Sequence, residues 1–293
     1  MYPTTTAKRG DVTTSIAVIG ATGTIGSRVI ARLRGRDVTV VQIARTYGID
    51  VITGTGLSQA LEGVDIAIDV SAPMPADDYL AITDTLTAAS RNIVGACASQ
   101  GVQRLVVLTI AGADKAVFDS FPYYVAKRAA EDVVLSSPVP ATIVKSTHCH
   151  EFATNRAVVT CNEHQVVVQD WLIQPIAADS VADVLVEAAL GQTHTPRTIT
   201  GPHGIRLPLF TAKLLALQGD YRRVRAVPPD LEELATGALL APDHAVVIGP
   251  DVETWLHAPA PTGTPSSTSA GGGFWTTRAT KHARSFTPLT PRN

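Results

Sequence analysis

The chain has 293 residues, of which 45% are apolar, so it is long enough to bury the core of a globular domain. Its net charge of −2 gives no footprint for nucleic acid or an anionic membrane, and no apolar run approaches the roughly 18 residues of a membrane-spanning helix. The polar stretch "MYPTTTAKRGDVTT" has no hydrophobic region of the signal-peptide kind, and the three widely spaced cysteines suit a reducing compartment. We therefore expect a cytoplasmic protein that acts on a small molecule.

Short β-branched runs alternate with longer helical stretches between residues 15 and 145. The runs predict strands at 15–20, 38–44, 50–52, 65–70, 104–110 and 141–145. The stretches between them predict helices after Gly23, after Gly56, across 78–100 and across 122–136. Each parallel neighbour then has the crossover helix that its connection requires. This alternation is typical of a Rossmann-type α/β fold, a doubly wound parallel sheet.

The pattern becomes less regular after residue 146. The stretch 165–190 predicts one or two strands and a helix capped by Asp179 or Ser180. Two further helices are predicted at 207–219 and 229–241, with the short basic strand "YRRVRAV" (221–227) between them. Insertions after the later strands of an open α/β fold build the wall opposite the cofactor. Residues 146–257 are therefore expected to form a small C-terminal substrate-binding lobe within a single domain, 1–257.

The composition changes at residue 258 to a stretch rich in Pro, Gly, Ser and Thr that contains no carboxylate. This composition predicts that residues 258–293 are disordered. The stretch has four basic side chains, Arg278, Lys281, Arg284 and Arg292. They are interpreted as a solvated extension, with binding to an acidic partner as the alternative.

Three glycines spaced three residues apart follow the first predicted strand, in the stretch "VIGATGTIGSRVIARLRG" (18–35). A strand that ends in glycines and leads into a helix places backbone N–H groups and the positive helix end beside a pyrophosphate. The spacing G-x-x-G-x-x-G departs from the commoner G-x-G-x-x-G, so a purely structural turn is the alternative. The strand before and the amphipathic helix after favour a dinucleotide site made by the loop residues Gly20, Thr22, Gly23, Thr24, Ile25 and Gly26.

The end of the second predicted strand bears on the choice between NAD and NADP. A carboxylate there would pair with the ribose 2′-hydroxyl of NAD and repel the 2′-phosphate of NADP. Between Val38 and Ile49 the only charged side chain is Arg45, whose planar guanidinium suits a phosphate. NADP is therefore the preferred cofactor, and NAD is the alternative if Arg45 is an ordinary surface arginine.

A second constellation lies in residues 106–131, where Thr109 ends a predicted strand and Tyr123 and Lys127 follow on a predicted helix. The i, i+4 spacing places Tyr123 and Lys127 on one helix face. A neighbouring ammonium lowers the pKa of a phenol from its solution value of about 10, which suits acid–base work near neutral pH. Lys127 can also bind the nicotinamide ribose, and Thr109 can hold the substrate oxygen. Tyr124 is the weaker candidate for the acid–base role and a candidate for the substrate pocket.

Several stretches between residues 14 and 257 resemble the short-chain dehydrogenase/reductase superfamily, and within it the atypical, NmrA-like NAD(P)-binding group. "GATGTIG" is similar to that group's phosphate loop, and "DVSAP" (69–73) to its loop along the cofactor. "LTIAGAD" and "YYVAKRAAE" resemble its active-site strand and helix, and "ATIVKSTHCHEFA" (141–153) the segment after its sixth strand. The resemblance implies that Ser71 and Ala72 bind the cofactor. It also implies that Thr109, Tyr123 and Lys127 are the hydroxyl residue, acid–base tyrosine and lysine of a reductase, with threonine in place of the usual serine.

The expected function is an NAD(P)H-dependent oxidoreductase that transfers a hydride between nicotinamide and a small organic carbonyl or alcohol. The resembled group also includes regulators that bind the nucleotide without turning it over, so an NAD(P)-sensing protein is the alternative. Such sensors often lack the tyrosine, and its presence here favours an enzyme. An epimerase or dehydratase, which reduces and reoxidises its cofactor within one cycle, is a third and weaker alternative.

The stretch "HCHE" (148–151) places two histidines, a cysteine and a glutamate side by side. Neighbours in an extended segment point alternately to opposite sides, and no second His/Cys pair with metal spacing is present, so we expect no metal site. His148 and His150 are predicted to line the substrate pocket. Cys149 is interpreted as a buried thiol, and Asp69 as a partner in a structural hydrogen bond.

Overall fold

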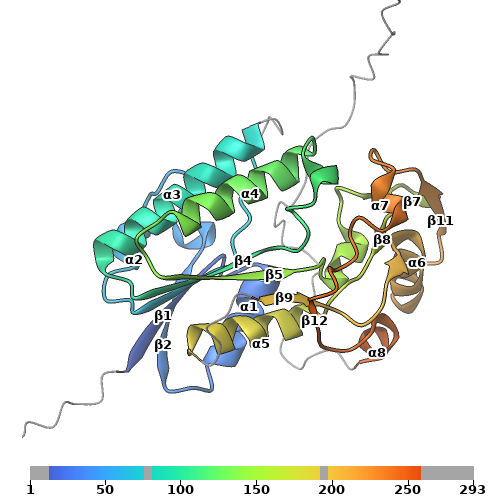
Figure 1. Cartoon of the computed structure of the whole chain (residues 1–293). Helices are drawn as coiled ribbons and strands as arrows, with labels where there is room; N and C mark the ends of the chain where they lie inside the picture. Colours follow the sequence, from blue (N-terminus) through green and yellow to red (C-terminus); the bar gives the residue numbers. More distant parts are fainter. Residues whose placement is uncertain (1–12, 76–80, 192–196, 259–293) are drawn as a thin grey trace, which may run out of the picture.

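The computed structural model describes residues 13–75, 81–191 and 197–258 (Figure 1). The main feature is a seven-stranded sheet in the order β12-β9-β5-β4-β3-β1-β2, with every neighbouring pair parallel. Its strands are β1 (Thr14–Ile19), β2 (Val38–Ile43), β3 (Ile66–Asp69), β4 (Arg104–Ile110), β5 (Ala141–Ser146), β9 (Arg197–Thr200) and β12 (Val246–Val247). The predicted Rossmann-type fold is confirmed. The predicted disordered stretch, apart from Ala258, lies outside the described residues.

Helices cover both faces of the sheet (Figure 1). One face carries α1 (Thr24–Leu33) and α5 (Ala178–Ala189), and the other carries α2 (Leu57–Ala60), α3 (Ile82–Gln100) and α4 (Pro122–Leu135). Successive residues of a strand point to opposite faces. In β1, Ile16 and Val18 therefore pack in the core with α1 and α5, whereas Ala17 and Ile19 pack in the core with α2 and α3.

The strand order reverses beside β1, which pairs with β2 on one side and β3 on the other. The chain leaves β1 through α1 to reach β2, and returns through α2 to β3. In open α/β sheets, ligands bind outside the carboxyl ends of the strands at such a reversal. The loops after β1 and β3 flank this position.

A smaller lobe adjoins the carboxyl ends of the strands (Figure 1). It contains a three-stranded sheet of β6 (Val159–Cys161), β7 (Gln165–Gln169) and β11 (Arg223–Val227), with α6 (Leu207–Leu217) packed against it. The remaining elements are the strand pair β8 (Leu172–Ile173) and β10 (Ile205–Arg206) and two short helices, α7 (Glu233–Thr236) and α8 (Val252–His257). Within the described residues, no helix is long and apolar enough to cross a bilayer.

Three local predictions are wrong. Residues 51–53 form turns instead of a strand, and the side chain of Asp50 accepts the backbone N–H of Ile52 at 2.8 Å, as in an Asx turn. The helix α5 begins two residues earlier than a cap at Asp179 would place it, with Ala177 at its N-cap, so Asp179 and Ser180 lie inside its first turn. The helix predicted at 229–241 is reduced to the single turn α7.

Candidate functional site

A cleft of about 460 Å³ opens at the carboxyl ends of β1, β3, β4 and β5. It is lined by four groups of residues: the glycine loop and the start of α1, residues 70–72 after β3, the end of β4 with one face of α4, and most of residues 146–156 after β5. Of the residues predicted for the site, Gly23, Thr24, Ile25, Ser71, Ala72, Thr109, Tyr123, Lys127 and His148 line this cleft. The volume is within the range of small-molecule and cofactor sites.

The glycine loop turns sharply at the end of β1. Gly20 adopts φ of +85°, and the N–H groups of Gly20 and Ala21 both donate to the carbonyl of Ile43, at 2.9 and 3.1 Å. A Cβ atom on Gly26 would lie 2.2 Å from the carbonyl oxygen of Gly20, so this close packing requires glycine. Gly20 and Gly26 therefore shape the loop without lining the cleft, and Thr22 lies exposed in its turn.

The start of α1 fits a diphosphate. Gly23 is the N-cap residue, and no side chain of the described residues caps the helix, so the N–H groups of Thr24, Ile25 and Gly26 have no side-chain acceptor there. These groups carry the partial positive charge of the helix end, and Gly23, Thr24 and Ile25 line the cleft. The loop and the helix terminus together can hold the diphosphate of a dinucleotide.

Arg45 begins the 3₁₀ turn η1 (Arg45–Tyr47) directly after β2 and is exposed. It follows Ile43 by two residues, and Ile43 holds the glycine loop through its carbonyl group. Arg45 therefore lies beside the glycine loop, at the end of the edge strand, without lining the cleft itself. Within the described ranges, its guanidinium makes no ion pair.

Asp69 fixes the loop after β3. It is buried at the end of that strand, and its Oδ1 atom accepts the backbone N–H of Ser71 at 2.8 Å. Burial raises the pKa of the Asp69 carboxyl, and the bond from Ser71 opposes that shift. This is the structural hydrogen bond expected for Asp69, and it holds Ser71 and Ala72 at the cleft.

Thr109, Tyr123 and Lys127 come together in the cleft. Thr109 lies near the carboxyl end of β4, and α4 begins with Pro122 at its first position, just before Tyr123. The Nζ atom of Lys127 lies 5.7 Å from the centroid of the Tyr123 ring. This places a cation beside the Tyr123 ring, and the Thr109 hydroxyl is in the same cleft.

Two residues predicted for the substrate pocket lie elsewhere. Tyr124 is 1% exposed, and its ring stacks on Phe118 with the centroids 4.0 Å apart. His150 is 0% exposed, and its ring faces Phe210 and Trp255 in the core of the lobe. Tyr124 and His150 lie on the sides of their segments that face away from the cleft. The lobe covers those sides, so both residues are part of the core.

His148 and Cys149 follow β5, and both line the cleft. Burial lowers the pKa of His148 to about 4, so its ring is neutral near pH 7. Burial raises the pKa of the Cys149 thiol to about 12, so the thiol is protonated at neutral pH. Within the part of the chain that the structure describes, no three His, Cys, Asp or Glu side chains are grouped to hold a metal ion.

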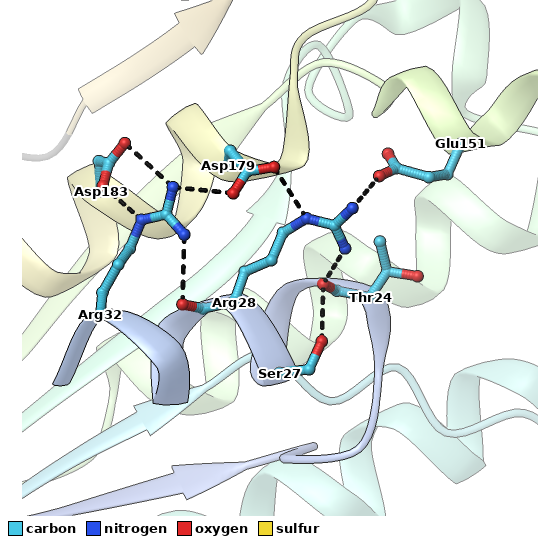
Figure 2. Close-up of polar contacts among 7 residues, drawn as sticks. All are labelled: Thr24, Ser27, Arg28, Arg32, Glu151, Asp179 and Asp183. Carbon is cyan, nitrogen blue, oxygen red and sulfur yellow. Dashed lines mark hydrogen bonds and ion pairs between the residues drawn. The ribbon is translucent and has the colours of Figure 1, made fainter. Parts of the chain in front are cut away.

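Sequence reasoning missed Arg28, which links three segments (Figure 2). Its Nη1 atom donates to the carbonyl of Thr24 at 2.7 Å, Nη2 to Glu151 at 2.7 Å, and Nε to Asp179 at 3.1 Å. Glu151 lines the cleft, and burial raises its pKa while Arg28 opposes that shift. Arg28 therefore ties the glycine loop to the cleft wall after β5 and to α5, and it balances the charge of Glu151.

The chain is similar to known proteins in its family and in its fold. A family model described as NAD(P)H-binding matches residues 20–191. No curated protein matches the chain. Three solved structures share the fold: a dTDP-4-dehydrorhamnose reductase from Bacillus anthracis in complex with NADP, the Bordetella bronchiseptica enzyme WbmH in complex with NAD⁺, and a UDP-N-acetylglucosamine 4-epimerase from Bacillus cereus.

The likeness to these structures extends over most of each chain. The TM-scores are 0.59, 0.57 and 0.55, with sequence identities of 14%, 14% and 15%, in the same order. The matches cover 76%, 83% and 78% of this chain and 87%, 91% and 96% of the others. At such low sequence identity, the likeness shows a shared fold alone and not a shared activity.

Proposed function

Because the chain belongs to the NAD(P)H-binding family, we propose that it is an NAD(P)H-dependent oxidoreductase that reduces a carbonyl, or oxidises the alcohol, of a small organic molecule. One observation carries the proposal: Thr109, Tyr123 and Lys127 line the same cleft as the glycine loop. A protein that only sensed the nucleotide would not need an acid–base group beside the cofactor.

Thr109, Tyr123 and Lys127 have separate roles at the substrate oxygen. A bound nicotinamide supplies or accepts the hydride at the substrate carbon. In the reducing direction, the Thr109 hydroxyl donates a hydrogen bond that holds the carbonyl oxygen, and the Tyr123 phenol gives that oxygen its proton. The Lys127 ammonium stabilises the phenolate that remains, and the proton returns to Tyr123 from solvent. In the oxidising direction, the Tyr123 phenolate accepts the proton of the alcohol.

We propose NADP as the preferred cofactor, with Arg45 binding the 2′-phosphate. Arg45→Ala is expected to weaken NADPH binding roughly tenfold and to leave NADH binding unchanged, because only NADPH carries the phosphate that pairs with a guanidinium. Parallel fluorescence titrations with the two cofactors measure this difference. Arg36→Ala, which removes another exposed arginine just before β2, is the control. Equal affinities for both cofactors, unaffected by Arg45→Ala, would overturn the preference.

The reaction itself is tested by mixing the protein with NADPH and a panel of aldehydes and ketones while the nicotinamide absorbance is followed. We expect net oxidation of NADPH with at least one carbonyl compound. Tight binding of NADPH without net consumption across the panel would overturn the proposal and favour a sensor or an epimerase.

A further inference from the structure

The cleft wall after β5 has a different character at each of its two ends. At the near end, Glu151 is tied to the glycine loop through Arg28 (Figure 2). At the far end, the carbonyl oxygen of Asn155 accepts the N–H groups of Val158 and Val159, where the chain enters β6 of the lobe. The near end therefore faces the diphosphate position, and the far end belongs to the lobe.

Aromatic rings line another part of this wall. The rings of His148 and Phe152 lie 4.3 Å apart, and the ring of Trp171 lies 5.5 Å from Phe152 and supports it from the lobe. His148 and Phe152 line the cleft, and His148 is neutral near pH 7. This surface suits an apolar or planar part of a ligand.

The far end of the wall presents hydrogen-bond donors for which the described part of the chain offers no acceptor. The side-chain oxygen of Asn155 accepts the N–H of Ala157 at 2.9 Å, and its amide N–H groups have no partner among the described residues. Arg156 is exposed and lines the cleft, and the structure gives it no ion pair within the described ranges. Among the described residues, Glu151 is the only carboxylate that lines the cleft, and Arg28 already balances its charge. An anion is thus the ligand that would form an ion pair with the Arg156 guanidinium.

We propose that the substrate is an anionic carbonyl compound whose carboxylate or phosphate is bound by Arg156 and Asn155, and whose apolar part packs on His148 and Phe152. This inference rests on the proposed function and names its substrate class. A guanidinium and a side-chain amide both line the cleft there, and each can donate hydrogen bonds to an anion's oxygens.

Binding to the protein saturated with NADP⁺ tests the assignment without requiring turnover. The probes are phenylglyoxylate, an aromatic 2-oxo acid, and its neutral methyl ester, both measured by calorimetry. Phenylglyoxylate is expected to bind more tightly than the ester. Arg156→Ala is expected to weaken binding of the acid about tenfold and to leave binding of the ester unchanged, whereas Arg156→Lys retains part of the affinity. Arg225→Ala, an exposed arginine of β11 outside the cleft, is the control.

Three results would overturn the assignment. They are equal binding of acid and ester, binding of neither, and a loss of NADP⁺ affinity in Arg156→Ala as large as the loss of acid affinity. The last result would assign Arg156 to a phosphate of the cofactor. Acid-selective binding in a protein that never consumes NADPH would instead refute the proposed oxidoreductase and leave the anion site standing.

Discussion

Tyr123→Phe is expected to lower kcat roughly a hundredfold or more, because the substitution removes the proton donor and keeps the ring. The ring of Tyr123 lies near Lys127 in the cleft, so the phenylalanine occupies the same space. The dissociation constant of NADPH should therefore remain close to that of the wild type. Steady-state kinetics with a confirmed carbonyl substrate, together with a cofactor titration, measure the two quantities.

The neighbouring tyrosine provides a matched control. Tyr124→Phe removes a hydroxyl from the same helix, but Tyr124 is buried against Phe118 and does not line the cleft. The kcat of Tyr124→Phe is expected to stay within a few fold of the wild-type value. A wild-type kcat in Tyr123→Phe, or an equal loss of kcat in both variants, would show that Tyr123 is not the acid–base residue.

Gly26→Ala is expected to weaken dinucleotide binding on the order of a hundredfold, because the loop must move from its position. The added Cβ atom would lie 2.2 Å from the carbonyl oxygen of Gly20 and 2.9 Å from the Cα atom of Ala21, and neither backbone atom can yield without reshaping the turn. Overpacking of this kind also lowers the free energy of unfolding by about 1–3 kcal/mol. Cofactor titration and urea unfolding measure both effects.

Gly35→Ala serves as the control, because a Cβ atom there would meet nothing within 4 Å. We expect this variant to bind the dinucleotide like the wild type. If Gly26→Ala bound the dinucleotide as tightly as the wild type, the close packing at Gly26 would not be required for holding the cofactor.

Local sequence patterns suffice for the central part of the fold. The apolar periodicity of α1 and the glycines before it predict the turn after β1, and the i, i+4 spacing of Tyr123 and Lys127 predicts that they share a helix face. The structure then brings both side chains into one cleft with Thr109. These features depend on neighbours in the sequence, which explains why they can be read without a structure.

The strand predicted at 50–52 is absent because a residue distant in the sequence bonds to its backbone. The side-chain amide of Asn92, on α3, donates to the carbonyls of Val51 and Ile52 at 3.0 and 2.8 Å. These bonds satisfy backbone groups that a sheet would otherwise pair. An apolar run alone cannot distinguish a strand from a turn that is buried under a helix.

The site residues that escaped prediction depend in the same way on tertiary contacts. Arg28 and Arg32 are spaced four apart on α1, as Asp179 and Asp183 are on α5, and this complementary spacing is the one signal in the sequence. Their pairing needs the two helices side by side on one face of the sheet (Figure 2). After β5 the chain turns into the 3₁₀ helix η4 (His150–Thr154), so His148 lines the cleft while His150 packs in the core of the lobe.

A crystal structure of the full-length chain with NADP⁺ would locate the cofactor directly. We expect the diphosphate against the N–H groups at the start of α1, and the nicotinamide ring facing Thr109 and Tyr123, with its reactive carbon within roughly 3–4 Å of a substrate carbon held there. A dinucleotide bound outside the cleft, or one with its nicotinamide turned away from Tyr123, would contradict the proposal that the glycine loop holds a cofactor for reaction at Tyr123.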